Sequence, residues 1–256
     1  MLRELMTRIR QGHQTADAFP DGPPPAMPER FRGAPEIDPA RCKPAACARC
    51  VEACPTQAAR MEGGELKLDL GRCLFCPACA EACGEGALTF TQDIRLAASK
   101  REELVAGAGP RKLATALPEE LRALFGRSLK LRQVSAGGCN GCEAEITAMN
   151  NVVFDASRFG VQVVASPRHA DGLLVTGPVT ENMRRALMKT WEATPAPKIV
   201  IAAGACAISG GPYRGHPEQH DGVEKFLPVD LYIPGCPPHP LTILDGLLRM
   251  IGRIKG

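Results

Sequence analysis

The sequence of 256 residues predicts two units of different fold class in one chain. Eight of the twelve cysteines lie within residues 41–91, which predicts a small α+β unit organised around its thiols. From residue 129 onward, short apolar strands alternate with segments of helical periodicity. This alternation predicts an α/β unit with an open, mostly parallel sheet that is covered on both faces.

The composition excludes several classes of protein. Hydrophobic residues make up 45% and charged residues 23% of the chain, so it is neither disordered nor fibrous. The net charge of +3 and the 4% aromatic content argue against a nucleic-acid partner. The longest nearly apolar stretch, residues 199–208, is far shorter than the ~20 residues of a membrane span. The N-terminus does not resemble a secretory signal, so we expect a cytoplasmic protein whose thiols stay reduced and bind metal.

Residues 1–40 predict a helix followed by an arm. Leu2, Leu5, Met6 and Ile9 recur at helical spacing among arginines, which indicates a short amphipathic helix over residues 1–11. We expect this helix to dock, either on the core of this chain or on a membrane subunit or lipid headgroup surface. Residues 12–40 are rich in proline and glycine and are expected to form an extended arm.

Residues 41–92 are expected to form a domain with an approximate internal duplication. Each half has a cysteine-rich loop, a turn and a short strand, and the strands are predicted at Leu66–Leu68 and Ala87–Thr91. Residues 93–128 are expected to be a linker with two short helices, Ala98–Leu104 and Glu119–Phe125.

The last unit is expected to span residues 129–256. Its predicted strands are Leu129–Val134, Val161–Ala165, Gly172–Thr176, Ile199–Ala203 and Asp230–Ile233. Its predicted helices are Glu143–Asn150, Glu181–Glu192 and Pro240–Ile251.

The spacing of the first eight cysteines predicts two [4Fe–4S] clusters. Three closely spaced cysteines can wrap three corners of the cube, and in two-cluster ferredoxins the fourth cysteine of each run serves the other cluster. On this pattern cluster A takes Cys42, Cys47, Cys50 and Cys83, and cluster B takes Cys73, Cys76, Cys79 and Cys54. Zinc is the alternative, but zinc knuckles pair two CxxC units and do not use a doubled x2-x2-x3 run.

Two departures from the usual ferredoxin spacing are present. Four residues, instead of two, separate Cys42 from Cys47, and Gly84 follows Cys83 where proline is usual. The insertion puts Cys42 in question: without it, cluster A would become a labile three-iron site.

The other four cysteines predict a third [4Fe–4S] cluster, cluster C. Three of them follow predicted parallel strands, so they share the carboxyl edge of the sheet, where open α/β sheets bind ligands. Nearby glycines allow the backbone to approach a bulky inorganic group. The cysteines of cluster C are Cys139, Cys142, Cys206 and Cys236. A Zn(Cys)4 site and unrelated buried thiols are the alternatives.

Four stretches of the α/β unit resemble one family. They are Gly137-Gly-Cys-Asn-Gly-Cys-Glu-Ala-Glu-Ile146, Ala170–Thr180, Pro197–Cys206 with Gly210-Gly211, and Pro228–Pro240. They closely resemble the small-subunit family shared by membrane-bound [NiFe] hydrogenases and the 20-kDa subunit of respiratory NADH:quinone oxidoreductase. Residues 1–105, with Phe31-Arg32-Gly33 and Leu68-Asp-Leu-Gly-Arg-Cys73, look like the two-cluster ferredoxin subunit of the same complexes. The chain thus looks like two neighbouring subunits fused in order.

The resemblance implies a flavodoxin-like fold for the α/β unit. It also implies that cluster C lies nearest the active site of a large subunit. The separated pair Cys139-Asn-Gly-Cys142 has the hydrogenase form, which favours a group 4, energy-converting or formate hydrogenlyase-like enzyme. His239 also suits that group, although a surface role at the start of a helix is the simpler use of this residue.

We therefore expect an oxidoreductase subunit that relays electrons through three [4Fe–4S] clusters to or from the Ni–Fe site of a large subunit. No catalytic residue is predicted in this chain, because no thiol is left over for nickel. The expected partners are that large subunit, membrane subunits, and a ferredoxin or formate dehydrogenase-type electron donor. The chain is expected on the inner face of the cell membrane. The alternative is a subunit of a complex I-like or nickel-free hydrogenase-related oxidoreductase.

Glu143 and Glu145 beside cluster C are read either as groups that assist proton movement or as ordinary helix-start carboxylates.

Overall fold

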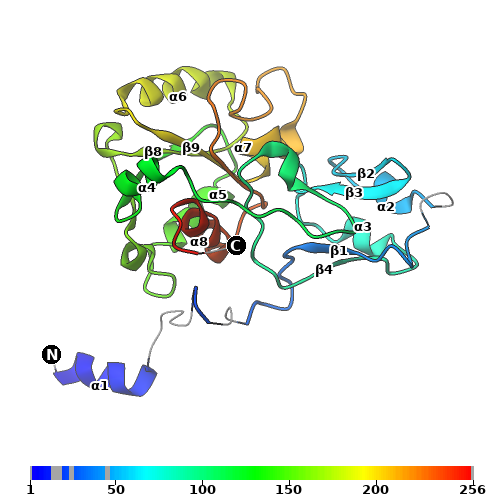
Figure 1. The fold of residues 1–256 in the computed structure, drawn as a ribbon, viewed down its shortest axis with the longest axis horizontal. Coiled ribbons are helices and arrows are strands. Elements are labelled where there is room, and N and C mark those ends of the chain that lie inside the picture. The colour runs from blue at the N-terminus through cyan, green and yellow to red at the C-terminus, as the bar shows by residue number, and fades with distance from the viewer. Residues whose placement is uncertain (1, 13–18, 23–25, 44–46, 255–256) are drawn as a thin grey trace.

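The computed structural model describes residues 2–12, 19–22, 26–43 and 47–254, and it contains two adjacent units (Figure 1). Helix α1 (Leu2–Gln11) stands apart from both of them (Figure 1). Its apolar residues Leu2, Leu5, Met6 and Ile9 are 46–77% exposed. The amphipathic helix is therefore present as expected, but its apolar face does not dock on the core of this chain. Within the described residues, no helix is long and apolar enough to cross a bilayer.

The second unit contains the expected parallel sheet. Five strands lie in the order β10-β9-β8-β6-β7, and every neighbouring pair is parallel. Numbered along the chain from β6, this is the 2-1-3-4-5 order of flavodoxin-like sheets. The strands are β6 (Leu129–Ser135), β7 (Val161–Val163), β8 (Gly172–Thr176), β9 (Ile199–Ala203) and β10 (Leu231–Ile233).

Helices cover both faces of this sheet. Residues Val200 and Ala202 of β9 pack on one face with α6 (Glu181–Ala193) and α7 (Ala205–Ser209). The alternate residues of β9 pack on the other face with three helices, α4 (Glu119–Phe125), α5 (Gly141–Ala148) and α8 (Pro240–Met250). The first of these cores continues without a break into the cysteine-rich unit, where it includes Leu68, Leu70 and Leu88. The two units are therefore joined by shared apolar burial.

The cysteine-rich unit contains two similar halves related by a shift of 29 residues. Strand β1 (Pro35–Ile37) pairs antiparallel with β4 (Leu88–Phe90), and β2 (Ala59–Glu62) pairs antiparallel with β3 (Glu65–Asp69). The short helices α2 (Arg49–Glu52) and α3 (Ala78–Glu81) occupy equivalent positions. In both halves the fourth cysteine accepts a 3.2 Å bond from the backbone N–H four residues later, and the intervening positions Gln57 and Gly86 have a positive φ. The internal duplication is confirmed.

Strand pairing extends beyond the segment expected to form the cysteine-rich domain. Strand β1 lies within the expected arm, and β5 (Val105–Ala106), which pairs with β3, lies within the expected linker. Instead of the helix expected at Ala98–Leu104, the chain is extended at Ala98 and forms a 3₁₀ turn at Arg101–Leu104. Ala98 exchanges backbone bonds of 3.0 and 2.9 Å with Tyr232 at the edge of the sheet, which satisfies polar groups that a helix would leave unpaired. The other 3₁₀ turns are Ala156–Phe159, Pro167–His169 and Gly211–Tyr213.

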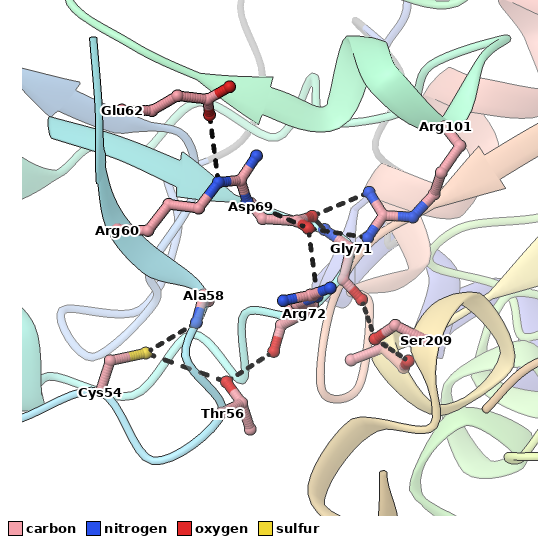
Figure 2. A network of polar contacts seen from close by, with 11 residues as sticks. Cys54, Thr56, Ala58, Arg60, Glu62, Asp69, Gly71, Arg72, Arg101 and Ser209 are labelled. Atoms are coloured by element: carbon pink, nitrogen blue, oxygen red, sulfur yellow. Dashed lines mark hydrogen bonds and ion pairs between the residues drawn. The ribbon is translucent and has the colours of Figure 1, made fainter. Parts of the chain in front are cut away.

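A buried carboxylate orders the loop of the cysteine-rich unit that contacts the second unit. The Asp69 side chain, 5% exposed, accepts two 2.8 Å bonds from the guanidinium of Arg101 and one 2.9 Å bond from the backbone N–H of Gly71 (Figure 2). Arg72 and Arg60 lie 3.5 and 3.6 Å away from the same carboxylate. The hydroxyl of Ser209 in α7 donates to the carbonyl oxygen of Gly71 at 2.8 Å. The loop before Cys73 is therefore fixed to both units.

Replacing Asp69 by asparagine is expected to destabilise the protein. The substitution leaves Arg101 and Arg72 without their shared counter-charge, and breaking a buried pair costs about 3 kcal/mol. For a chain of this size, that corresponds to an apparent melting temperature lower by roughly 6–12 °C. Glu62→Gln is the matched control, because Glu62 pairs with Arg60 at the exposed rim of the same network. Equal melting temperatures for the two variants would contradict a structural role for Asp69.

His239 caps the start of α8. Its Nδ1 accepts the backbone N–H of Leu241 at 3.2 Å, and its ring contacts the rings of Phe31 and Phe154 edge-on, with centroids 5.6 Å apart. The expected role of His239 at the start of a helix is confirmed, but the ring is half-buried and does not lie freely at the surface as expected. Burial lowers the pKa of His239. Because Nδ1 accepts a hydrogen bond, it carries no proton, and the imidazole ring of His239 is therefore neutral.

Acidification is therefore expected to destabilise the fold through His239. Because its folded-state pKa lies below its unfolded value, the unfolded chain takes up the proton first, and stability falls as the pH drops below about 6.5. His239→Asn keeps a capping side chain but does not titrate. We expect a smaller fall in apparent melting temperature between pH 7.5 and 5.5 for this variant than for the unmodified protein. An identical fall in both proteins would show that other groups cause it.

Candidate functional site

The twelve cysteines, all free thiols, fall into three groups of four. Quartet A consists of Cys42, Cys47, Cys50 and Cys83, which together line one cavity. Burial and the neighbouring thiols Cys83 and Cys47 raise the pKa of Cys42, so Cys42 lies with the other three despite the longer spacer. Residues 44–46 of that spacer are outside the described part of the chain.

Quartet B consists of Cys54, Cys73, Cys76 and Cys79. As the sequence predicted, it combines the last cysteine of the first run with three cysteines of the second run. Burial raises the pKa of Cys73 to about 12 and that of Cys79 to about 11, and in both residues the nearby Cys54 and Cys76 thiols contribute. Backbone N–H groups point at two of the sulfur atoms: Phe75 donates to Cys73 and Ala58 donates to Cys54, each at 3.2 Å. Such N–H···S bonds stabilise thiolate ligands and tune cluster potentials.

Quartet C consists of Cys139, Cys142, Cys206 and Cys236, and it lies at the carboxyl edge of the parallel sheet. Cys139 and Cys142 lie after β6, Cys206 follows β9 at the start of α7, and Cys236 follows β10. All four line one cavity, which Gly177 after β8 also reaches. The strand topology alone brings these residues together, because the carboxyl ends of parallel strands share one edge.

Glycines make room around the sulfur atoms of quartet C. A Cβ on Gly204 would lie 2.5 Å from the Cys142 sulfur, and a Cβ on Gly211 would lie 2.8 Å from the Cys206 sulfur. Both glycines also have a positive φ, at +91° and +55°. The site thus has the small-residue lining that a bulky inorganic group requires, and the residues present fit a cluster.

Burial makes an isolated thiolate costly at these sites. It is the main cause of the raised pKa of Cys206, about 12, and it also raises the pKa of Cys142. Cysteines bind metal as thiolates, so bound iron would have to supply the compensating positive charge. In the described part of the chain, no three His, Cys, Asp or Glu side chains are close enough together to hold a single metal ion.

Quartets B and C are neighbours, since Phe75, next to Cys76, lines one cavity with Cys236. Burial raises the pKa of Cys236, and the thiols of Cys139 and of Cys76, which belongs to quartet B, raise it further. Quartets A and B are linked by their exchanged fourth cysteines, Cys83 and Cys54. The order in space is therefore A, B, C.

Two carboxylates lie beside quartet C in different environments. Oε1 of the buried Glu143 accepts bonds of 2.7 and 2.6 Å from the hydroxyls of Ser135 and Thr176, which lie at the ends of β6 and β8. Its Oε2 has no hydrogen-bond partner among the described residues. Although burial acts in the opposite direction, the bonds from Thr176 and Ser135 hold the pKa of Glu143 below its ordinary value. Burial raises the pKa of Glu145, which lines a separate cavity with His239 and Cys236.

One residue beside quartet A was missed by the sequence analysis. The Nε of Arg49 lies 3.5 Å from the Cys47 sulfur, and its hydrogen bond lowers the pKa of Cys47. In the sequence, the only sign of this arginine contact is Gly84, which stands after Cys83 where proline is usual.

Comparison with known proteins identifies relatives of the second unit. Residues 139–250 match the family described as NADH ubiquinone oxidoreductase, 20 Kd subunit. Formate hydrogenlyase subunit 7 of Escherichia coli is 49% identical over 129 residues, which are 50% of this chain and 51% of that protein. The probable membrane-bound hydrogenase subunit mbhJ of Pyrococcus furiosus is 44% identical over 135 residues, 53% of this chain and 81% of that protein.

A respiratory protein is also similar. A subunit of the NADH-quinone oxidoreductase of Bacteroides thetaiotaomicron is 41% identical over 133 residues, which are 51% of this chain and 66% of that protein. The chain spans about half the length of the formate hydrogenlyase subunit, and each match covers about half of the chain. The relatives are subunits of a formate hydrogenlyase, of a probable membrane-bound hydrogenase and of an NADH-quinone oxidoreductase. Through its second unit, the chain belongs to the NADH ubiquinone oxidoreductase 20 Kd subunit family.

Proposed function

We propose that this protein is an electron-transfer subunit of a membrane-associated [NiFe] hydrogenase complex and holds three [4Fe–4S] clusters. The observation that carries the proposal is the grouping of all twelve cysteines into three quartets in the spatial order A, B, C. Each cluster, when bound, supplies a site that takes up and releases one electron. Membership of the family supports an electron-transfer role in a hydrogenase or complex I-like assembly.

We further propose that residues 41–92, with the strands β1 and β5 that pair with them, are a two-cluster ferredoxin-like domain fused to the hydrogenase-type unit. The internal repeat, the two antiparallel strand pairs and the exchanged fourth cysteines support this assignment. The protein's own residues exclude water through burial and donate backbone N–H bonds to sulfur, which are the two means by which a protein sets cluster potentials.

The hydrogenase assignment is favoured by the spacing of the first two cysteines of quartet C. Cys139 and Cys142 flank the loop Asn140-Gly141, and the relatives of high identity include two hydrogenase-type subunits. On this proposal a large subunit carries the Ni–Fe site and contacts the sheet edge that holds quartet C. A complex I-like or nickel-free oxidoreductase is the second candidate, favoured by the similarity to the NADH-quinone oxidoreductase protein.

We propose that the protein lies peripherally on the cytoplasmic face of the membrane, with α1 as its contact. The exposed apolar residues of α1 are flanked by Arg3 and Arg10, a pattern that suits a membrane subunit or anionic headgroups. A ferredoxin or a formate dehydrogenase-type protein is the proposed electron donor. No nucleic acid is involved on this proposal.

Metal analysis of the anaerobically purified complex tests the proposed function. With a tag on this chain, we expect about twelve iron atoms per chain and nickel in the co-purifying large subunit. Twelve irons without nickel would move the function to the second candidate. Zinc in place of iron would overturn both.

Exchange of the fourth cysteines gives a separate prediction. Cys83→Ser is expected to disrupt cluster A, and Cys54→Ser is expected to disrupt cluster B, although each residue belongs to the other cysteine run. Iron content should fall by about one to four atoms per chain in each variant. Electron paramagnetic resonance should show the loss or conversion of a different signal in the two variants, with cluster C unchanged. Loss of the same signal in both would contradict the exchanged assignment.

A further inference from the structure

The two halves of the cysteine-rich unit differ at a pair of positions that contact each other. Arg49 of α2 corresponds to Ala78 of α3, and Gly84 corresponds to Pro55, each pair being related by the 29-residue shift. Although Arg49 and Gly84 come from different halves, a Cβ on Gly84 would lie 2.6 Å from Nη2 and 2.9 Å from Nη1 of Arg49. Beside quartet A these two positions hold arginine and glycine. Beside quartet B the corresponding positions hold alanine and proline.

This exchange places a guanidinium beside quartet A and no charged group at the corresponding position beside quartet B. The guanidinium of Arg49 lines the cavity formed by the four cysteines of quartet A, and its Nε lies 3.5 Å from the Cys47 sulfur. At the equivalent place beside Cys76, Ala78 offers no polar side chain. The backbone around these two positions is alike in the two halves: Ala53 donates to the Arg49 carbonyl at 2.9 Å, and Ala82 donates to the Ala78 carbonyl at 3.0 Å.

We propose that Arg49, in the space left by Gly84, raises the reduction potential of cluster A relative to cluster B. This inference rests on the proposed presence of the clusters. Reduction adds one negative charge to a cluster, and a nearby guanidinium stabilises the reduced state more than the oxidised one. Arg49 is exposed, so water and salt screen the effect and the shift is smaller at high ionic strength. The result is a fixed difference in potential between two sites with nearly the same backbone.

Gly84 provides a test that leaves the charge unchanged. The atoms that a side chain at position 84 would meet are the far end of Arg49, which can move away. We therefore expect proline at position 84 to move the guanidinium away from its present place while its charge stays on the protein. No backbone bond from the N–H of Gly84 is present among the described residues, so proline removes no such bond.

Redox titration of the anaerobically purified complex, followed by electron paramagnetic resonance, tests the inference. The variants are Arg49→Gln, Gly84→Pro and the double variant Arg49→Ala with Gly84→Pro, which gives quartet A the residue pair found at quartet B. We expect all three to lower the midpoint potential of cluster A and to leave clusters B and C unchanged. The Cys83→Ser variant identifies the signal of cluster A. Arg184→Gln on the exposed surface of α6 is the control for loss of one positive charge and should move none of the three.

The outcomes separate this inference from the proposed function. An unchanged cluster A potential in Arg49→Gln, with iron still at about twelve atoms per chain, would overturn the inference and leave the proposed function standing. A shift in Arg49→Gln but none in a Gly84→Pro protein of full iron content would overturn the role assigned to Gly84. If the Gly84→Pro variant loses iron, the midpoint potential of cluster A in the Arg49→Gln variant alone decides whether the inference stands. A lack of iron in the unmodified protein would overturn the proposed function and this inference with it.

Discussion

The ion pair between Asp69 and Arg101 fixes the loop of the cysteine-rich unit that contacts the α/β unit. Asp69 ends β3, Arg101 begins the 3₁₀ turn that leads into β5, and the carbonyl of Gly71 between them accepts the hydroxyl of Ser209 in α7. The loop that carries Cys73 and the helix that carries Cys206 are thus tied to one network (Figure 2). The geometry between quartets B and C depends on this network, because a shift of the loop would move Cys76 relative to Cys236. The carboxylate of Asp69 is 5% exposed and lies 2.8 to 3.6 Å from three guanidiniums.

Parallel pairing imposes the second constraint. The strand order places the ends of β6, β8, β9 and β10 along one edge, and quartet C and the hydrogen bonds of Glu143 all lie there. Glu143 accepts from residues at the ends of two neighbouring strands, so it fixes the start of α5, which carries Cys142, against the sheet. The packing of glycines against the sulfur atoms of Cys142 and Cys206 leaves no space for a β-carbon at those positions. The site is therefore built from backbone geometry, with few polar side chains.

The cysteine-rich unit shows how a repeated backbone can hold two unlike sites. Bonds from Ala58 and Ala87 to the fourth cysteines have the same length in both halves, and Gln57 and Gly86 share the same backbone region. The halves differ at two positions: Arg49 lies against Gly84 beside quartet A, and the corresponding residues beside quartet B are Ala78 and Pro55. Electrostatics, which depends on single charged groups, can differ between the halves even though the hydrogen-bonded framework does not.

The sequence by itself determined the elements whose signals are local. Strands Gly172–Thr176 and Ile199–Ala203 and helix Glu119–Phe125 have the predicted bounds, because continuous apolar runs and helical periodicity are read within a few residues. Cysteine spacing predicted which residues would meet, and the fold brings the same quartets together, while their ligation stays a prediction. Only the tertiary structure decided the rest. Helices α2 and α3 have four residues each, too few for periodicity, and β1 and β5 exist only because distant strands supply their partners. Ala98 is extended for the same reason, since Tyr232 pairs with it across the sheet edge, and the contact of Arg49 with Gly84 joins residues 35 positions apart. Such contacts depend on which segments meet in space, which local sequence patterns do not record.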